Sequence, residues 1–202
     1  MTTVAVVYHS GYGHTAVLAD QVAAGARAAG SDVRLLPIES AAQDFGPLLD
    51  QISDADAVVF GAPTYMGDVS AAFRAFTEAS SRVFATGGWG DKLAAGFTNS
   101  HSFAGDKTHA LASLAIFAAQ HGMNWINLGV PAPSVTAAER GPETLNRVGA
   151  FLGLAAQSDN ASTEVTPPTG DRRTAYLLGE RVAKAAQRWT SGQIAEPLAN
   201  AA

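Results

Sequence analysis

The apolar positions of this chain follow two alternating spacings, which predict a regular succession of strands and helices. Five short runs are almost continuously apolar and are bounded by polar residues or glycine, as expected of strands that are buried on both faces. The predicted strands are residues 4–8, 33–38, 56–61, 92–97 and 124–128. Elsewhere apolar residues recur at intervals of three and four, which predicts helices. The predicted helices are residues 16–23, 45–52, a segment after Ser70, 108–120, and a last one that begins near Asp171.

Two of the helix ends carry local signals. The hydroxyl of Ser70 can accept an N–H of the first turn of the helix that carries Phe73 and Phe76. Gly122 is expected to close the helix over residues 108–120, because glycine tolerates the left-handed conformation that commonly ends a helix.

Strands that alternate with helices indicate an α/β protein with a parallel sheet covered by helices on both faces. We expect one domain over residues 1–202. The exception to the alternation is the stretch of about residues 130–170, which is rich in proline and holds an apolar patch at residues 148–154. A connection of this length is typical of a lid or an interface, and we expect an insertion of that kind here.

The turn after the first predicted strand carries the strongest chemical signal. Residues 10–15 read Ser-Gly-Tyr-Gly-His-Thr, between an apolar strand and an apolar helix. Backbone N–H groups at such a helix start point at an anion, and the helix dipole adds positive potential there. Ser10 and Thr15 supply hydroxyl donors, and no Lys or Arg precedes Arg27. The turn therefore predicts a site for the terminal phosphate of a mononucleotide, held by N–H and O–H groups.

Three other interpretations of this turn were weighed. A P-loop is excluded because no Gly-Lys-Ser/Thr follows. The G-x-G-x-x-A pattern of a dinucleotide site fits residues 11–16 loosely, but the acidic residue that should hold the ribose, Glu39, comes late, after Pro37. An ordinary glycine-containing turn is the remaining alternative.

Two further loops are expected at the same edge of the sheet. Residues 61–68, Gly-Ala-Pro-Thr-Tyr-Met-Gly-Asp, follow the third predicted strand, and Tyr65 and Met66 supply the apolar surface that a flat heteroaromatic ring requires. Residues 98–105 follow the fourth predicted strand and carry hydroxyl, amide and imidazole groups. Loops after these strands meet at the carboxyl edge of a doubly wound sheet, which is where such folds bind ligands.

Composition narrows the functional classes. The chain has 202 residues, no cysteine and a formal charge of −5 without a basic run, so disulfides, thiolate metal sites and nucleic-acid binding are not expected. No stretch is apolar enough to span a membrane, and no signal peptide is recognisable, so we expect a cytoplasmic protein. The five histidines lack metal-ligand spacing, and no metal is predicted. His121, at a helix end, could reach the ligand or could simply cap its helix.

Together these motifs resemble the flavodoxin-like fold and, more closely, the NAD(P)H:quinone oxidoreductases of the WrbA type. The resemblance rests on Tyr8 with residues 10–15, on residues 60–68, on residues 90–94 and on residues 121–123. It implies a five-stranded parallel sheet of order 2-1-3-4-5, bound FMN, hydride transfer from NAD(P)H, a quinone-like acceptor, and a homodimer or homotetramer. The chain departs from the family pattern at Phe84, in the third loop, and over residues 130–170.

The resemblance also implies roles for individual residues. The phosphate would lie on Ser10, Gly13, His14 and Thr15, and Tyr12 would meet the nicotinamide nucleotide. The remaining cofactor-binding candidates are Pro63, Thr64, Tyr65, Met66, Gly67, Asn99, Ser100, His101, Ser102 and His121. The flavin would carry the chemistry, with His121 or Tyr65 as a proton relay. The alternative functions are a flavodoxin-type one-electron carrier that docks to redox partner proteins, and a binding module without flavin.

Overall fold

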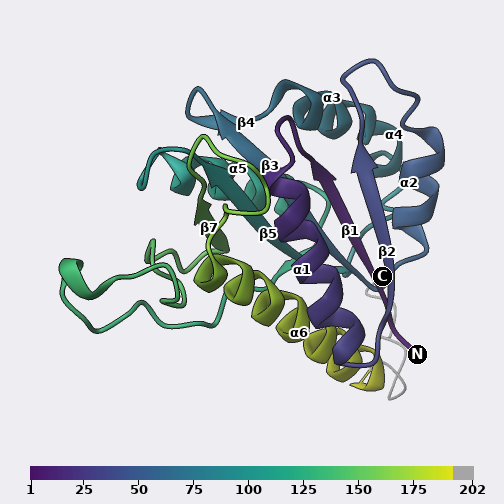
Figure 1. Ribbon diagram of the computed structural model, residues 1–202. Coiled ribbons are helices and arrows are strands. Elements are labelled where there is room, and N and C mark those ends of the chain that lie inside the picture. The colour runs from purple at the N-terminus through teal and green to yellow at the C-terminus, as the bar shows by residue number, and fades with distance from the viewer. Residues whose placement is uncertain (193–202) are drawn as a thin grey trace.

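The computed structural model describes residues 1–192 and confirms the α/β fold (Figure 1). The main parallel strands are β1 (Thr3–His9), β2 (Asp32–Ile38), β3 (Ala57–Tyr65), β5 (Leu93–Ser100) and β6 (Asn124–Trp125). They lie in the order β2-β1-β3-β5-β6, which is the predicted order 2-1-3-4-5. Two further strands bring the sheet to seven: β4 (Asp68–Val69) pairs antiparallel with β3, and β7 (Leu154–Gln157) pairs parallel with β5.

Helices cover both faces of the sheet. The helices α1 (His14–Ala28) and α6 (Thr169–Gly192) pack on one face, and α2 (Gly46–Ser53), α3 (Ala71–Ala79) and α5 (Lys107–Gln120) pack on the other. Short helical segments, α4 (Ser81–Phe84) and η1 (Ala137–Glu139), complete the list of helices. Within residues 1–192, no helix combines the length and the apolar composition that a membrane crossing requires.

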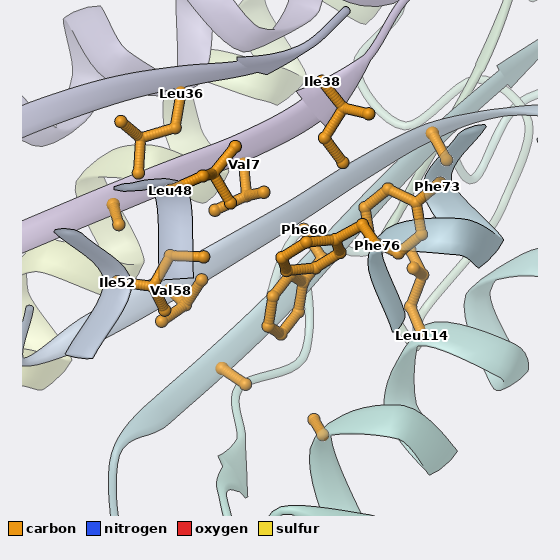
Figure 2. Close-up of a cluster of buried hydrophobic side chains, with 14 of the residues drawn as sticks. Val7, Leu36, Ile38, Leu48, Ile52, Val58, Phe60, Phe73, Phe76 and Leu114 are labelled. Carbon is orange, nitrogen blue, oxygen red and sulfur yellow. The ribbon is translucent and has the colours of Figure 1, made fainter. Parts of the chain in front are cut away.

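The strands are apolar on both faces because each face has its own core. On the α2–α3–α5 face, Val7 and Phe60 meet Phe73 and Phe76 in a cluster of buried side chains (Figure 2). On the other face α1 and α6 lie so close that a Cβ at Gly179 would collide with the backbone carbonyl of Val22. These two cores hold the carboxyl ends of the strands in fixed positions.

Two predicted boundaries were wrong at the carboxyl edge. The strands β3 and β5 run further than expected, so that residues 62–65 and 98–100 are strand rather than loop. Pro63 is tolerated inside β3 because pairing with β1 stops at Gly61, so the missing N–H of the proline faces no strand on that side. The caps were predicted correctly: Ser70 Oγ accepts the N–H of Phe73, and Gly122 takes a positive φ of 71° just after α5.

Two short strands, β6 and β7, share the position next to β5 at the edge of the sheet. Only residues 124–125 of the predicted strand 124–128 pair with the start of β5, whereas β7 pairs with its end. Residues 126–153 connect β6 to β7. The middle of this segment extends away from the helices and the sheet (Figure 1), whereas Leu128 is buried in the core and Asn146 and Arg147 bond to α6. The prediction of one long insertion over residues 130–170 was therefore wrong at its C-terminal end, where a buried strand contributes to the sheet.

Candidate functional site

The carboxyl ends of β1, β3, β5 and β7 surround an open pocket of about 540 Å³. Its lining residues are Tyr12, His14, Thr15, Pro63, Thr64, Tyr65, Met66, Asn99, Ser100, His101, Ser158, Asp159 and Asn160. The volume lies within the range of sites for small molecules and cofactors. The structure thus brings together the three loops that the sequence singled out, and it adds a fourth.

The first wall is the turn between β1 and α1. Gly13 has a φ of 88° and directly precedes the helix, and the hydroxyl of Ser10 accepts the N–H of Ala16 at 3.1 Å. Within residues 1–192, the N–H groups of residues 11–15 donate no hydrogen bond. Unpaired donors at a helix start carry positive potential. Because Ser10 Oγ acts as an acceptor inside the chain, its proton stays available, so the turn can donate several hydrogen bonds to one anion without a basic side chain.

The second wall is the hairpin that joins β3 to β4. Met66 and Gly67 form its two-residue turn with positive φ values of 49° and 86°, and Met66 is fully exposed at the tip. The turn is held from outside, since Nδ1 of His109 lies 2.9 Å from the carbonyl oxygen of Gly67. A positive φ is costly for methionine, so this hairpin stores strain beside the pocket.

Tyr65, at the end of β3, links the first two walls. Its hydroxyl lies over Gly11 so closely that any Cβ there would collide with it, and its ring meets Tyr12 edge to face at 6.3 Å. Burial, with a smaller contribution from Tyr12, raises the pKa of the Tyr65 phenol above its ordinary value. The phenol therefore stays protonated near neutral pH and can act as a hydrogen-bond donor.

The remaining walls come from β5 and from the segment after β7. Asn99 and Ser100 end β5, and Oδ1 of Asn99 accepts the hydroxyl of Ser158 at 2.8 Å. The segment after β7 is also tied to the first turn, because Nε2 of His14 lies 2.8 Å from the carbonyl oxygen of Ala161. A side chain at Gly13 would meet Thr163 of the same segment at 2.8 Å.

The sequence analysis missed Ser158, Asp159 and Asn160 because it did not recognise β7. The available signal was a short apolar run, residues 154–156, followed by polar residues, which is the pattern of the other strand ends at this edge. Alanine-rich runs of this length are weak strand signals, and only pairing with β5 identifies this one.

Not every candidate residue lies in the pocket. Ser10 and Gly13 shape the first turn from behind, Gly67 faces His109, and the carbonyl oxygen of Ser102 accepts a hydrogen bond from Lys107. These residues border the pocket without lining it.

His121 lies at the opposite edge of the sheet, so the expectation that it reaches the ligand does not match this structure. The helix α5 runs antiparallel to the strands, and its end therefore lies beside Asn124, which pairs with the first residue of β5. The buried imidazole of His121 lies 2.9 Å from Ser80 Oγ and packs on Trp89 with ring centres 4.4 Å apart. Burial lowers the pKa of His121.

Comparison with known proteins agrees with this geometry. A family model described as flavodoxin matches residues 6–115. Flavodoxin FldP of Pseudomonas aeruginosa is 38% identical over 93% of this chain and 98% of that protein, and an NAD(P)H dehydrogenase (quinone) of Archaeoglobus fulgidus is 30% identical over 93% of this chain and 99% of that protein.

A solved structure leads to the same family. The WrbA-like flavodoxin of Agrobacterium tumefaciens superposes with a TM-score of 0.73 at 36% identity, over 93% of this chain and 99% of that one. The expected resemblance to the WrbA type is thereby confirmed. With this fold, this strand order and these relatives, the chain belongs to the flavodoxin family.

Proposed function

We propose that this chain binds FMN in the pocket at the carboxyl edge and transfers electrons from NAD(P)H to a quinone or a similar acceptor. The observation that carries the proposal is the first turn, where unpaired N–H groups and the Ser10 hydroxyl open beside an aromatic-lined cavity. No Lys or Arg lines that cavity, so its donors for a phosphate are main-chain amides and hydroxyls together with the imidazoles of His14 and His101.

The other walls suit the ring of the same cofactor. Pro63, Tyr65 and Met66 offer apolar surface, and Asn99 and Ser100 offer polar groups for a heteroaromatic edge. When bound, FMN would accept a hydride and pass on two electrons, while the chain positions it and limits its contact with water. Tyr12, which lines the cavity and is 80% exposed, would contact the nicotinamide donor.

A one-electron carrier is the second candidate, and the name of the Pseudomonas relative, flavodoxin, favours it. Carriers commonly steer toward their partners with a strongly charged face. The rim of this pocket instead presents exposed Tyr12 and Met66, which suits a small apolar acceptor better than an electrostatically steered protein. We therefore rank the quinone reductase first.

Two measurements test the proposal in sequence. Titration of the purified chain with FMN should give tight binding, identified by quenching of flavin fluorescence; a chain that ignores FMN contradicts both candidates. The FMN-loaded protein should then oxidise NADH or NADPH in the presence of benzoquinone with steady-state turnover. Binding of FMN without any turnover would support the carrier instead.

A further inference from the structure

Lys107, the first residue of α5, has its side chain buried directly behind the β5 wall of the pocket. Only 1% of the residue is exposed, and its Nζ donates to Ser100 Oγ at 2.9 Å and to the carbonyl oxygen of Ser102 at 2.6 Å. Because Ser100 lines the cavity, one hydroxyl group separates this ammonium from the ligand space.

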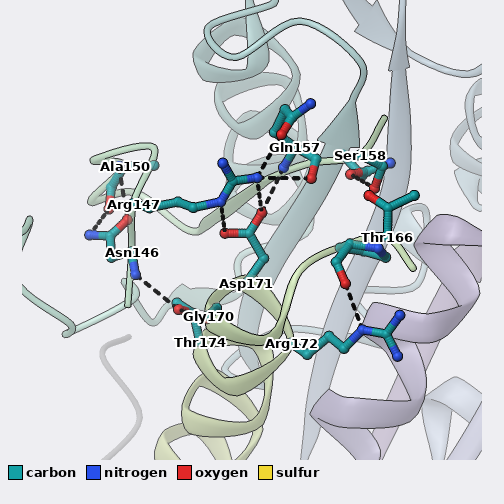
Figure 3. Close-up of polar contacts among 12 residues, drawn as sticks. Asn146, Arg147, Ala150, Gln157, Ser158, Thr166, Gly170, Asp171, Arg172 and Thr174 are labelled. Carbon is teal, nitrogen blue, oxygen red and sulfur yellow. Dashed lines mark hydrogen bonds and ion pairs between the residues drawn. The ribbon is translucent and has the colours of Figure 1, made fainter. Parts of the chain in front are cut away.

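The ammonium has no carboxylate of its own. The nearby Asp171 accepts Nε and Nη2 of Arg147 at 3.0 and 3.1 Å, and the backbone N–H of Gln157 at 2.9 Å (Figure 3). Arg147 thus neutralises Asp171, and within residues 1–192 no carboxylate lies within salt-bridge distance of Lys107. The buried cluster behind the pocket therefore carries one excess positive charge.

This charge is unfavourable for the folded chain alone. Burial, the largest contribution, lowers the pKa of Lys107 to about 8, with Asp171 opposing the shift and Arg147 adding to it. The group is still mostly protonated at neutral pH. A methionine could fill the same space without a desolvation penalty, so the charge needs a reason other than packing.

We propose that Lys107 is a charge-compensating residue, which makes the pocket bind the reduced, anionic cofactor more tightly than the oxidised one. This inference rests on the proposed function. Transfer of a hydride to bound FMN would add two electrons and one proton to the flavin ring, which would then carry one negative charge. Only a second proton, taken from water, would cancel that charge. A fixed cation behind Ser100 stabilises that charge and so raises the two-electron reduction potential of bound FMN.

The test compares the two-electron potential of bound FMN in the wild type, in Lys107→Met, in Lys107→Gln and in Lys107→Arg. The two neutral variants should weaken binding of reduced relative to oxidised FMN about tenfold, which equals a fall of about 30 mV for a two-electron couple. Lys107→Arg, which keeps the charge, should stay near the wild type. The matched control is Lys92→Met, because Lys92 is also partly buried and donates to two carbonyl oxygens, but at the opposite end of β5.

The outcomes separate this inference from the proposed function. A wild-type chain that binds no FMN defeats the proposed function. A chain that binds FMN, but whose potential is unchanged or raised in both neutral variants, defeats only the role of Lys107. An equal loss of affinity for oxidised and reduced FMN would show that Lys107 merely supports the wall, and that result also overturns the inference.

Discussion

The two ends of β5 present opposite solutions to the same problem, the burial of polar groups at the edge of a sheet. At the amino end, Lys92 donates to the carbonyl oxygens of Ser53 and Ala55, both at 2.7 Å, and Trp89 Nε1 donates to the hydroxyl of Ser53. These side-chain groups are therefore paired within the chain, whereas Nδ1 of His121 at the same edge has no partner among the described residues. The side chains of Lys92 and Trp89 therefore need no ligand at that end.

At the carboxyl end of the sheet, within the described part of the chain, several hydrogen-bond donors lack acceptors, an apolar side chain is exposed to solvent, and a buried cation lacks a counterion. The N–H groups of residues 11–15 lack acceptors among the described residues, Met66 is fully exposed in a strained turn, and Lys107 carries a charge without a counterion. Groups left unsatisfied by the fold are the ones available to a ligand. The comparison therefore favours the carboxyl edge as the functional edge without any reference to relatives, and four predictions sharpen it.

The largest effect is expected when the ion pair behind the pocket is broken. Arg147→Met removes the hydrogen-bonded ion-pair partner of the buried Asp171 and should cost about 3–5 kcal/mol in the free energy of unfolding, measured by urea denaturation. The double variant Arg147→Met/Asp171→Leu should recover much of this loss, because it removes both charges of the pair and leaves the net charge of the buried cluster as it is in the wild type. Lys184→Met, in an exposed ion pair on α6, is the control and should have no measurable effect. Full stability of the single variant would contradict the role of the pair.

The second prediction concerns pH and compares the two lysines. The folded-state pKa of Lys107 is lowered to about 8, so between that pH and about 10.5 the unfolded chain binds more protons and the stability contributed by this group rises with pH. The stability of the wild type relative to Lys107→Met should therefore increase by about 2–3 kcal/mol across that window.

Lys92→Met is the matched comparison for this pH series. Burial also lowers the pKa of Lys92, but Asp56 and Asp54 oppose the shift, so a smaller change of the same sign is expected. Urea denaturation at a series of pH values measures both. If the difference in the free energy of unfolding between the wild type and Lys107→Met does not depend on pH, Lys107 is not a buried cation with a lowered pKa.

The third prediction compares two serines, one at each edge. Ser10→Ala removes a hydroxyl donor from the first turn and should weaken FMN binding about tenfold, or ~1.4 kcal/mol, as measured by fluorescence titration. Ser80→Ala, which removes the partner of His121 at the amino edge, should lower stability but leave FMN affinity unchanged. Equal losses of affinity in the two variants would refute the assignment of the phosphate to the first turn.

The smallest effect is expected at His121. Since the imidazole lies at the amino edge, His121→Gln should change FMN affinity by less than about twofold. A large loss of FMN, with the fold intact by circular dichroism, would show that a second copy of the chain brings this residue to the pocket.

Much of the fold and part of the site could be predicted from local patterns. The strand order followed from the resemblance to the flavodoxin-like fold, and the interpretation of the first turn followed from glycines and hydroxyls placed between a strand and a helix. The wall after β7 could not be predicted, because residues 154–157 are a strand only by virtue of pairing with β5. The position of His121 could not be predicted, because spacing along a helix does not state which edge of the sheet its end reaches.

The sequence by itself determined the alternation of elements, the caps at Ser70 and Gly122, and the turn rich in glycine and hydroxyl groups from which we propose an anion site, since each depends on residues close together in the chain. Only the tertiary structure decided that β7 completes the sheet, that Asp171 is neutralised by Arg147, and that Lys107 is left as a cation behind Ser100. Burial and charge compensation depend on contacts between segments that are distant in the sequence, and local sequence does not specify those contacts.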